Sequence, residues 1–349
     1  MRNISSNIKG YVNLRTLSDN VTIIKSKLSE NVKYCQVVKS RAYGHGMIEV
    51  ANAIYNLADY YAVGRVEEGV YLKRSGIYKP VLSLISTNFD DEIEDAILSG
   101  VELTICNINQ LKKTNEIAKR LCLSAVIHLK IDTGMNRQGL KTKEDIKVFL
   151  KEVRRAKNVI LKGVYSHLFN NESEKECKKQ LDLFLSLTKE IKEKYPDVIR
   201  HISASGGVLL GKEYNLDMVR VGLLSYGYNP PCKNQLTVKP ILKVYAPVLE
   251  RKIINANENV GYGDFKVDRE EKVTLLRLGY ADGFRRKNTN FFKNNLCMDL
   301  SFKSGFIEGD YAEIFGEKIS LCDLSLTLNT IPYELLVSLT TRAEIIYDK

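Results

Sequence analysis

Short apolar runs alternate with longer amphipathic segments through the first two thirds of the 349-residue chain. The apolar runs are typical of buried parallel strands, and they lie near residues 35–38, 60–64, 81–86, 101–106, 124–131, 159–166, 201–204 and 218–224. Helical periodicity characterises most of the segments between them, at 17–29, 47–58, 66–75, 90–99, 108–121, 142–156 and 174–194. The last gap, residues 206–217, leaves room for at most one turn of helix.

Eight predicted strands in alternation with helices have the rhythm of a (β/α)8 barrel of the TIM type. A doubly wound open sheet is the main alternative. Such a sheet more often carries a glycine-rich turn after its first strand, and the sequence holds no GxGxxG motif there. The pattern therefore favours the barrel within the α/β class.

The pattern changes after Pro230-Pro231, where strand-like runs follow one another closely at 238–254, 272–279, 310–315 and 330–337. We expect a barrel over residues 1–231 and a C-terminal, mostly-β domain over residues 232–349. The opening segment alternates like a strand at residues 9–14, so residues 1–14 are able to pair with the second domain.

Composition narrows the function classes. The net charge of +10 is spread among interleaved acids and bases, without the basic and aromatic block of a nucleic-acid binder. Seven cysteines and four histidines are dispersed, which predicts reduced thiols and no metal site. No apolar run approaches the roughly 18 residues of a membrane span. The N-terminal residues lack a signal peptide's apolar core, so we expect a cytoplasmic protein without membrane partners.

Lys39 is the first candidate for chemistry, because it ends the first predicted strand. In a barrel, reactive groups lie on the loops at the C-terminal ends of the strands. Desolvation there can lower the pKa of a lysine and suit it to Schiff-base chemistry with an aldehyde cofactor. The alternative is a strand-end lysine that reaches solvent.

Other polar residues end later strands of the predicted barrel. Arg137 follows the fifth, His167 closes the sixth, Ser205 closes the seventh and Arg220 lies in the eighth. Each alone has a structural explanation as an ion-pair former, core histidine, turn residue or strand-end charge. Together they predict a shared site, and backbone N–H groups near Ser205 and after Arg220 could receive a phosphate there.

Six segments, in order along nearly the whole chain, resemble motifs of the alanine racemases. They are VVKSRAYGHG at 37–46, KIDTGMNR at 130–137, VGYG at 260–263, GYADG at 279–283, CMD at 297–299 and YE at 333–334. Members of this fold-type III racemase family combine a barrel that binds pyridoxal 5'-phosphate with a C-terminal β domain. The resemblance implies a homodimer with shared active sites and an amino acid as substrate.

By that resemblance, Lys39 forms the Schiff base with pyridoxal 5'-phosphate and acts as one of two catalytic bases. Tyr262 of the partner subunit would be the other, on the opposite face of the substrate's α-carbon, because racemisation needs proton removal and delivery on opposite faces. Arg220 would face the pyridine nitrogen, where a guanidinium donates but cannot accept a proton. His167 would hold Arg220 and Tyr262 in a hydrogen-bonded line.

The resemblance also implies the remaining contacts. The phosphate would be held by Tyr43, Ser205, Gly222, Leu223 and Tyr333. Arg137 and the backbone N–H of Met298 from the partner subunit would position the substrate carboxylate. Lys130 matches a lysine that is often carbamylated in the family, with an unmodified amine as the alternative, and Asp299 and Tyr280 would support the site.

Several functions remain open from the sequence. By the resemblance, serine-preferring relatives carry a smaller polar residue where this chain has the bulky Tyr333, which favours alanine as substrate. The resemblance then implies a supply of D-alanine for peptidoglycan. A serine or broad-spectrum racemase is the alternative. A non-catalytic barrel protein that binds pyridoxal 5'-phosphate would lack the second domain, and a related decarboxylase would need a catalytic cysteine motif that the chain does not show. Departures from the family pattern occur at Ala204 and at Asn294-Asn295.

Overall fold

The computed structural model describes residues 7–259, 266–285, 292–293, 296–298, 307–308 and 310–348. It divides into two compact units. The barrel unit comprises Thr16–Ala42 and Met47–Lys239, and the C-terminal unit comprises Met1–Arg15, Tyr43–Gly46 and Pro240–Lys349. The chain therefore leaves the barrel unit directly after the Lys39 region and returns to it four residues later. The division into residues 1–231 and 232–349 stays a prediction.

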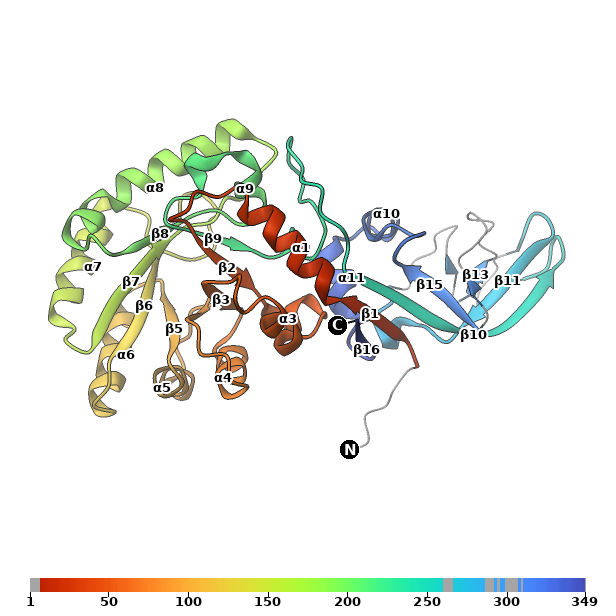
Figure 1. Ribbon diagram of the computed structural model, residues 1–349, viewed down its shortest axis with the longest axis horizontal. Helices are drawn as coiled ribbons and strands as arrows, with labels where there is room; N and C mark the ends of the chain where they lie inside the picture. Colours follow the sequence, from red (N-terminus) through yellow and green to blue (C-terminus); the bar gives the residue numbers. More distant parts are fainter. Residues whose placement is uncertain are drawn as a thin grey trace. The chain divides into compact units, whose positions relative to one another are not determined.

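Eight parallel strands form the barrel sheet, in the order β8-β7-β6-β5-β4-β3-β2-β9 (Figure 1). The strands are β2 (Lys33–Val37), β3 (Tyr60–Val63), β4 (Val81–Ser83), β5 (Val101–Ile105), β6 (Ala125–Lys130), β7 (Val159–Tyr165), β8 (Ile199–His201) and β9 (Met218–Val221). Backbone hydrogen bonds also span the seam between β8 and β9, from the N–H of Asp217 to the carbonyl of Arg200 and from Arg220 to Ser203, both at 3.0 Å. The predicted TIM-like barrel is confirmed.

Helices connect these strands. They are α1 (Leu14–Lys25), α3 (Met47–Ala53), α4 (Val66–Arg74), α5 (Asp90–Ser99), α6 (Ile108–Arg120), α7 (Lys143–Arg155), α8 (Glu174–Lys194), α9 (Ser205–Leu210) and the 3-10 turn η1 (Lys212–Tyr214). Several begin where a polar side chain caps the free N–H groups of the first turn. Asn107 accepts from Gln110 N–H at 2.9 Å, and Thr142 accepts from Asp145 N–H at 3.1 Å. None of the helices in the described part of the chain is both long and apolar enough to cross a membrane.

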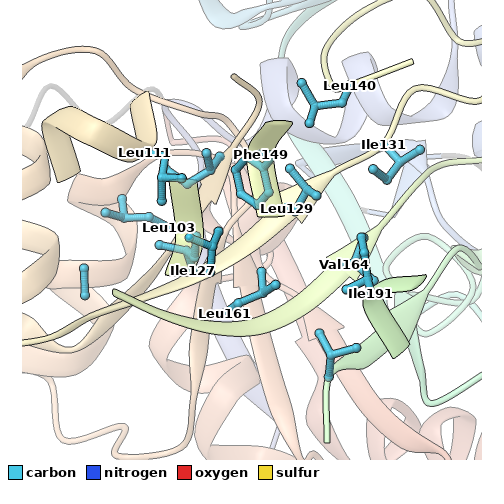
Figure 2. Packing of buried hydrophobic residues seen from close by; sticks show 14 of the residues in the cluster. Leu103, Leu111, Ile127, Leu129, Ile131, Leu140, Phe149, Leu161, Val164 and Ile191 are labelled. Atoms are coloured by element: carbon cyan, nitrogen blue, oxygen red, sulfur yellow. The ribbon is translucent and has the colours of Figure 1, made fainter. Parts of the chain in front are cut away.

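The barrel unit's core lies between the strands and the helices that cover them (Figure 2). Helix α7 shows how the sequence builds it, since Ile146, Phe149, Leu150 and Val153 are buried at helical spacing. Phe149 joins Ile127 of β6 in the buried cluster. Burying apolar area on this scale is the main source of the barrel's stability.

The C-terminal unit is a sheet of short and long strands. They are β1 (Lys9–Asn13), β10 (Leu242–Ile254), β11 (Glu271–Leu276), β12 (Phe292–Lys293), β13 (Leu296–Met298), β14 (Ile307–Glu308), β15 (Tyr311–Phe315) and β16 (Glu344–Asp348). The opening segment of the chain forms β1, which pairs antiparallel with β10 and parallel with β16. The unit also contains the 3-10 turn η2 (Tyr280–Asp282) and helix α10 (Leu321–Thr327).

One predicted strand is wrong. Residues 330–337 mostly belong to helix α11 (Pro332–Leu339). Proline is favoured in a helix's first turn, where its missing N–H costs nothing, and Leu335, Leu336 and Leu339 are buried at helical spacing. A short apolar run does not distinguish a buried strand from a buried helix, which explains the error.

Candidate active site

Lys39 follows β2 at the C-terminal edge of the barrel sheet, and its side chain is half-buried. Burial lowers the pKa of the Lys39 amine, and the positive charge of Arg137 lowers it further. Glu68 acts in the opposite direction and raises that pKa. A lowered pKa increases the neutral fraction of the amine, which is the nucleophilic form. The predicted candidate therefore lies in surroundings that suit Schiff-base chemistry.

Glu68 connects the ends of the first two barrel strands. Its carboxylate accepts hydrogen bonds from the backbone N–H groups of Ser40 at 2.5 Å, Gly64 at 2.7 Å and Arg65 at 3.2 Å. A Cβ at Gly64 would lie 3.5 Å from that of Lys39 and 3.0 Å from the Glu68 carboxylate. The sequence analysis missed Glu68, although a glutamate three residues after a helix's N-cap is a capping signal.

The residues after Lys39 form a left-handed turn. The helix α2 (Lys39–Tyr43) contains Ser40, Arg41 and Ala42 with φ of 53°, 55° and 55°, and Tyr43 has φ of 52°. L-residues avoid this region because the Cβ approaches the carbonyl oxygen, at a cost of about 1–2 kcal/mol per residue. Strain of this kind persists where surrounding structure imposes it, and it concentrates at functional sites.

Arg137 lies on a tight loop that Asp132 organises. The Asp132 carboxylate accepts from the backbone N–H of Gly134 at 2.9 Å and of Asn136 at 3.0 Å. Asn136 takes a left-handed φ of 55°, which asparagine tolerates better than most residues. The Arg137 side chain is exposed and is free of the core, so it can reach an anion at the strand ends.

Lys130, the last residue of β6, is buried inside the barrel. Burial holds the pKa of its amine well below the ordinary value of 10.5, and the charges of Arg220 and Arg137 act in the same direction. The amine lies 4.3 Å from the centre of the Tyr165 ring, whose face attracts a cation. Burial therefore raises the neutral, nucleophilic fraction of this amine above that of an exposed lysine at the same pH.

Arg220 is buried on β9 and donates to several acceptors. These are Nδ1 of His201 at 2.7 Å, the carbonyl of Ser166 at 2.8 Å and the carbonyl of Ile202 at 3.3 Å. A longer contact of 3.4 Å reaches Nδ1 of His167. The structure thus brings together two residues predicted for the site, Arg220 and His167.

The protonation states of this pair differ. Burial lowers the pKa of Arg220 to about 10, which leaves the guanidinium charged near neutral pH. Burial, followed by the charge of Arg220, lowers the pKa of His167 well below its ordinary value of 6.5. His167 is therefore neutral and can accept a hydrogen bond on Nδ1 from the guanidinium.

Ser205 opens α9 beside the end of β9. Its hydroxyl oxygen accepts from the backbone N–H groups of Gly222 and Leu224, both at 3.2 Å. Ala204 stands at the N-cap and provides no capping side chain. Serine hydroxyl and backbone N–H donors therefore gather at the ends of the last two barrel strands, where barrels commonly hold phosphate. Leu223 is buried in the same stretch.

Tyr43 and Tyr333 meet within the C-terminal unit, with ring centres 5.3 Å apart and planes at 67°. Edge-to-face packing of this kind is favourable for aromatic pairs. Burial raises the pKa of Tyr333 to about 12, so its phenol stays neutral. Next to Tyr43, Gly44 has φ of +85°, and a Cβ there would lie 1.9 Å from the Thr340 hydroxyl. The turn therefore requires glycine at this position.

The remaining predicted residues are less closely defined. Tyr280 is 70% exposed on η2. The backbone of Met298 ends strand β13. Tyr262 and Asp299 lie outside the described residues. Their roles stay predictions.

Comparison with known proteins identifies the family. The alanine racemase N-terminal domain matches residues 12–230, and the alanine racemase C-terminal domain matches residues 241–347. The alanine racemase of Treponema denticola is 34% identical over 372 residues, which cover 97% of each chain. Alanine racemase 2 of Caldanaerobacter subterraneus subsp. tengcongensis is 31% identical and covers 96% of this chain and 93% of its own.

Solved structures agree with these matches. The alanine racemase of Clostridium difficile 630 has a TM-score of 0.87 at 29% identity, over 98% of this chain and 96% of that one. The alanine racemase of Bartonella henselae, solved with covalently bound pyridoxal phosphate, has a TM-score of 0.85 at 26% identity, over 98% and 99% of the two chains. The chain belongs to the alanine racemase family.

Proposed function

We propose that this enzyme interconverts L- and D-alanine with pyridoxal 5'-phosphate, using Lys39 of one subunit and Tyr262 of the partner subunit as the two bases. The observation that carries the proposal is the amine of Lys39, half-buried at the barrel's C-terminal edge with a lowered pKa. Arg137 contributes to that lowered pKa and belongs to the same cluster of cationic strand-end residues.

The residues present fit a phosphorylated aldehyde cofactor. Lys39 offers a nucleophilic amine, and Arg220 offers a buried cation to the ring nitrogen. The Ser205 hydroxyl and the N–H of Leu223 offer phosphate donors, beside the N–H of Gly222, which donates to Ser205 and would turn to the phosphate. Tyr43 and Tyr333 would complete the phosphate contacts. When bound, the cofactor supplies an electron sink that makes the substrate's α-proton removable.

The protein's own groups would then move protons. Lys39, with its lowered pKa, accepts or returns a proton on one face of the substrate's α-carbon, and Tyr262 does so on the other. The 3.4 Å contact between Arg220 and His167 supports a hydrogen-bonded line that continues to Tyr262. The Arg220 guanidinium has only donors, so it would donate a hydrogen bond to the ring nitrogen and favour its unprotonated form, which would limit side reactions.

Substrate choice would depend on the groups around the α-carbon. Arg137 and the backbone N–H of Met298 of the partner subunit would hold the carboxylate. Tyr333, packed edge-to-face against Tyr43, would leave room for little more than a methyl side chain, which favours alanine. A serine or broad-spectrum racemase is the second candidate, because a hydroxyl adds little bulk.

The cellular role follows from the reaction. We infer a cytoplasmic homodimer that supplies D-alanine for peptidoglycan. A barrel-only protein that merely binds the cofactor is disfavoured, because the C-terminal family domain matches residues 241–347. The proposal divides the chain into a cofactor-binding domain at residues 1–231 and a second domain at residues 232–349.

The first experiment compares racemisation of L-alanine, L-serine and L-lysine by the purified protein. We expect alanine to react fastest; faster turnover of serine or lysine would contradict the role of Tyr333.

The second experiment follows the visible absorption band of the bound cofactor. Lys39→Ala should abolish the band, whereas Lys33→Ala, at the exposed N-terminal end of the same strand, should retain it. A band that survives in Lys39→Ala would remove Lys39 from its role.

A further inference from the structure

Four buried side chains form a continuous line of hydrogen bonds inside the barrel. We call Glu102, His128, His201 and Arg220 the buried relay. Glu102 Oε2 lies 2.8 Å from His128 Nε2, His128 Nδ1 lies 2.9 Å from His201 Nε2, and His201 Nδ1 lies 2.7 Å from a terminal nitrogen of Arg220. The relay joins strands β5, β6, β8 and β9, and each member is at most 7% exposed.

The two ends of the buried relay fix the direction of every bond. A guanidinium has only donors, so His201 Nδ1 must accept and His201 must carry its proton on Nε2. That proton is donated to His128 Nδ1, so His128 also carries its proton on Nε2 and donates it to Glu102. An ionised carboxylate has only acceptors, which completes the line without conflict.

The surrounding residues are shaped for the two histidines. A Cβ at Gly163 would lie 2.2 Å from His128 Nδ1, so β7 admits the ring only because it has glycine there. The ring of Tyr165 stacks on His201 at 4.8 Å with an interplanar angle of 8°. The hydroxyl of Tyr60 donates to the second Glu102 oxygen at 3.3 Å. Such specific packing indicates that the ring orientations are set by the fold.

The charges at the two ends compensate each other. A buried guanidinium without a partner charge is costly, and the amine of Lys130, whose pKa the charge of Arg220 lowers, offers no negative charge to compensate it. The charges of Arg220 and Glu102 both act on the thiol of Cys35, but burial raises the pKa of that thiol and keeps it protonated and uncharged. Among the groups of the relay, the compensating negative charge therefore comes from Glu102.

We propose that Glu102 is a positioning residue for racemisation: through His128 and His201 it fixes the orientation of Arg220 and compensates its charge. The inference rests on the proposed function, in which Arg220 faces the cofactor's ring nitrogen. It deepens that function by assigning a positioning role to Glu102 and His128, which would affect the ring nitrogen only through His201 and Arg220.

The bond directions can be measured without any turnover. In the protein without cofactor, ¹⁵N NMR of the histidine side chains should show both His128 and His201 neutral and protonated on Nε2. The His128 proton should be shifted downfield by the carboxylate and should move upfield in Glu102→Gln. A proton on Nδ1 of either ring, or a His128 signal unchanged in Glu102→Gln, would overturn the relay.

The functional effect needs the loaded enzyme and a matched control. Glu102→Gln keeps the size and an acceptor but removes the charge, and we expect kcat to fall about tenfold with KM changed less than about twofold. The pH midpoint of the cofactor's absorption change should move to lower pH, because losing a negative charge disfavours the protonated form. Glu102→Asp retains the negative charge, so its pH midpoint should lie close to the wild-type value.

The control is Gln36→Met, since Gln36 is another buried polar residue of the barrel, bonded to Tyr34 and Ser225 at 2.8 Å. It should leave the histidine tautomers and the absorption midpoint unchanged. If Glu102→Gln matched Gln36→Met in both the midpoint and kcat, the positioning role would be overturned. A wild-type protein that shows the predicted tautomers but no racemisation would instead contradict the proposed function and leave the relay intact.

Discussion

The Glu68 carboxylate accepts a hydrogen bond of 2.5 Å from the backbone N–H of Ser40, and so holds the residue that follows Lys39. The same carboxylate raises the pKa of Lys39 against the lowering by burial and by Arg137. Glu68 thus couples the position of the lysine to its charge.

Glu68→Gln should lower the pKa of Lys39 further, because the substitution removes the nearby negative charge that opposes the effect of burial. Arg137→Leu should raise the pKa of Lys39, because it removes a positive charge that lowers this pKa. The measurement is the rate of modification of Lys39 by an amine reagent against pH, in protein without cofactor. Glu67→Gln is the control, since Glu67 is an exposed neighbour paired with Arg65. If the modification rate had the same pH midpoint in Glu68→Gln and Glu67→Gln, the effect of Glu68 on the charge of Lys39 would be contradicted.

The left-handed turn after Lys39 predicts an unusual response to glycine. Arg41→Gly should raise the free energy of unfolding by up to about 1 kcal/mol, because relief of left-handed strain exceeds the extra chain entropy of glycine. Lys147→Gly, in the regular helix α7, should lower it by about 1 kcal/mol. Denaturant unfolding of both variants checks the contrast. Destabilisation by both would show that Arg41 is not strained.

Lys130 should be carbamylated. Burial holds its pKa well below 10.5 and so raises the fraction of neutral amine, the form that reacts with carbon dioxide. Arg220 and Arg137 would stabilise the resulting negative group. Labelled bicarbonate should give a carbamate signal in ¹³C NMR that disappears in Lys130→Met.

An unmodified Lys130 would behave differently. The unfolded chain would bind a proton that the folded chain does not, so the free energy of unfolding would rise with pH between the lowered pKa and 10.5. This rise would be steeper in the wild type than in Lys130→Met. Such a difference, together with a missing carbamate signal, would contradict the modification.

Tyr333→Ser should shift substrate preference toward serine. Removing the phenol that packs on Tyr43 opens space beside the substrate side chain, and we expect the serine-to-alanine ratio of kcat/KM to rise about 10- to 100-fold. Tyr78→Ser, at a position 81% exposed, serves as the control and should leave the ratio unchanged. An unchanged ratio in Tyr333→Ser would exclude this tyrosine as the determinant.

Much of the barrel could be predicted because its signals are local. Apolar runs such as that of β6 and caps such as Asn107 need no knowledge of distant residues. The helix α11 was mistaken for a strand because eight apolar-rich residues satisfy both periods, and only packing within the C-terminal unit decides between them. Residues at strand ends were predictable because a barrel gathers them at one edge.

Glu68, and the links from Arg220 through His201 and His128 to Glu102, were not predicted. Their roles depend on contacts between strands that are distant in sequence, such as the 2.9 Å contact between His128 and His201. A signal did exist, since Glu102 and Thr104 alternate with apolar residues in β5, and His128 and Lys130 do so in β6. That alternation indicates one polar face, but not that the face lines the interior of a barrel.

The most direct test of the account is complementation between two inactive variants, Lys39→Ala and Tyr262→Phe. If each active site combines Lys39 of one subunit with Tyr262 of the other, a mixed dimer has one intact site. When equal amounts of the two variants re-pair at random, about half of the dimers are mixed, and each mixed dimer has one intact site of two. The mixture should therefore show about a quarter of wild-type L-alanine racemisation, although each variant alone has almost none. Mixed dimers that form but remain as inactive as their parents, or a Tyr262→Phe parent with near-normal activity, would contradict the shared two-base site.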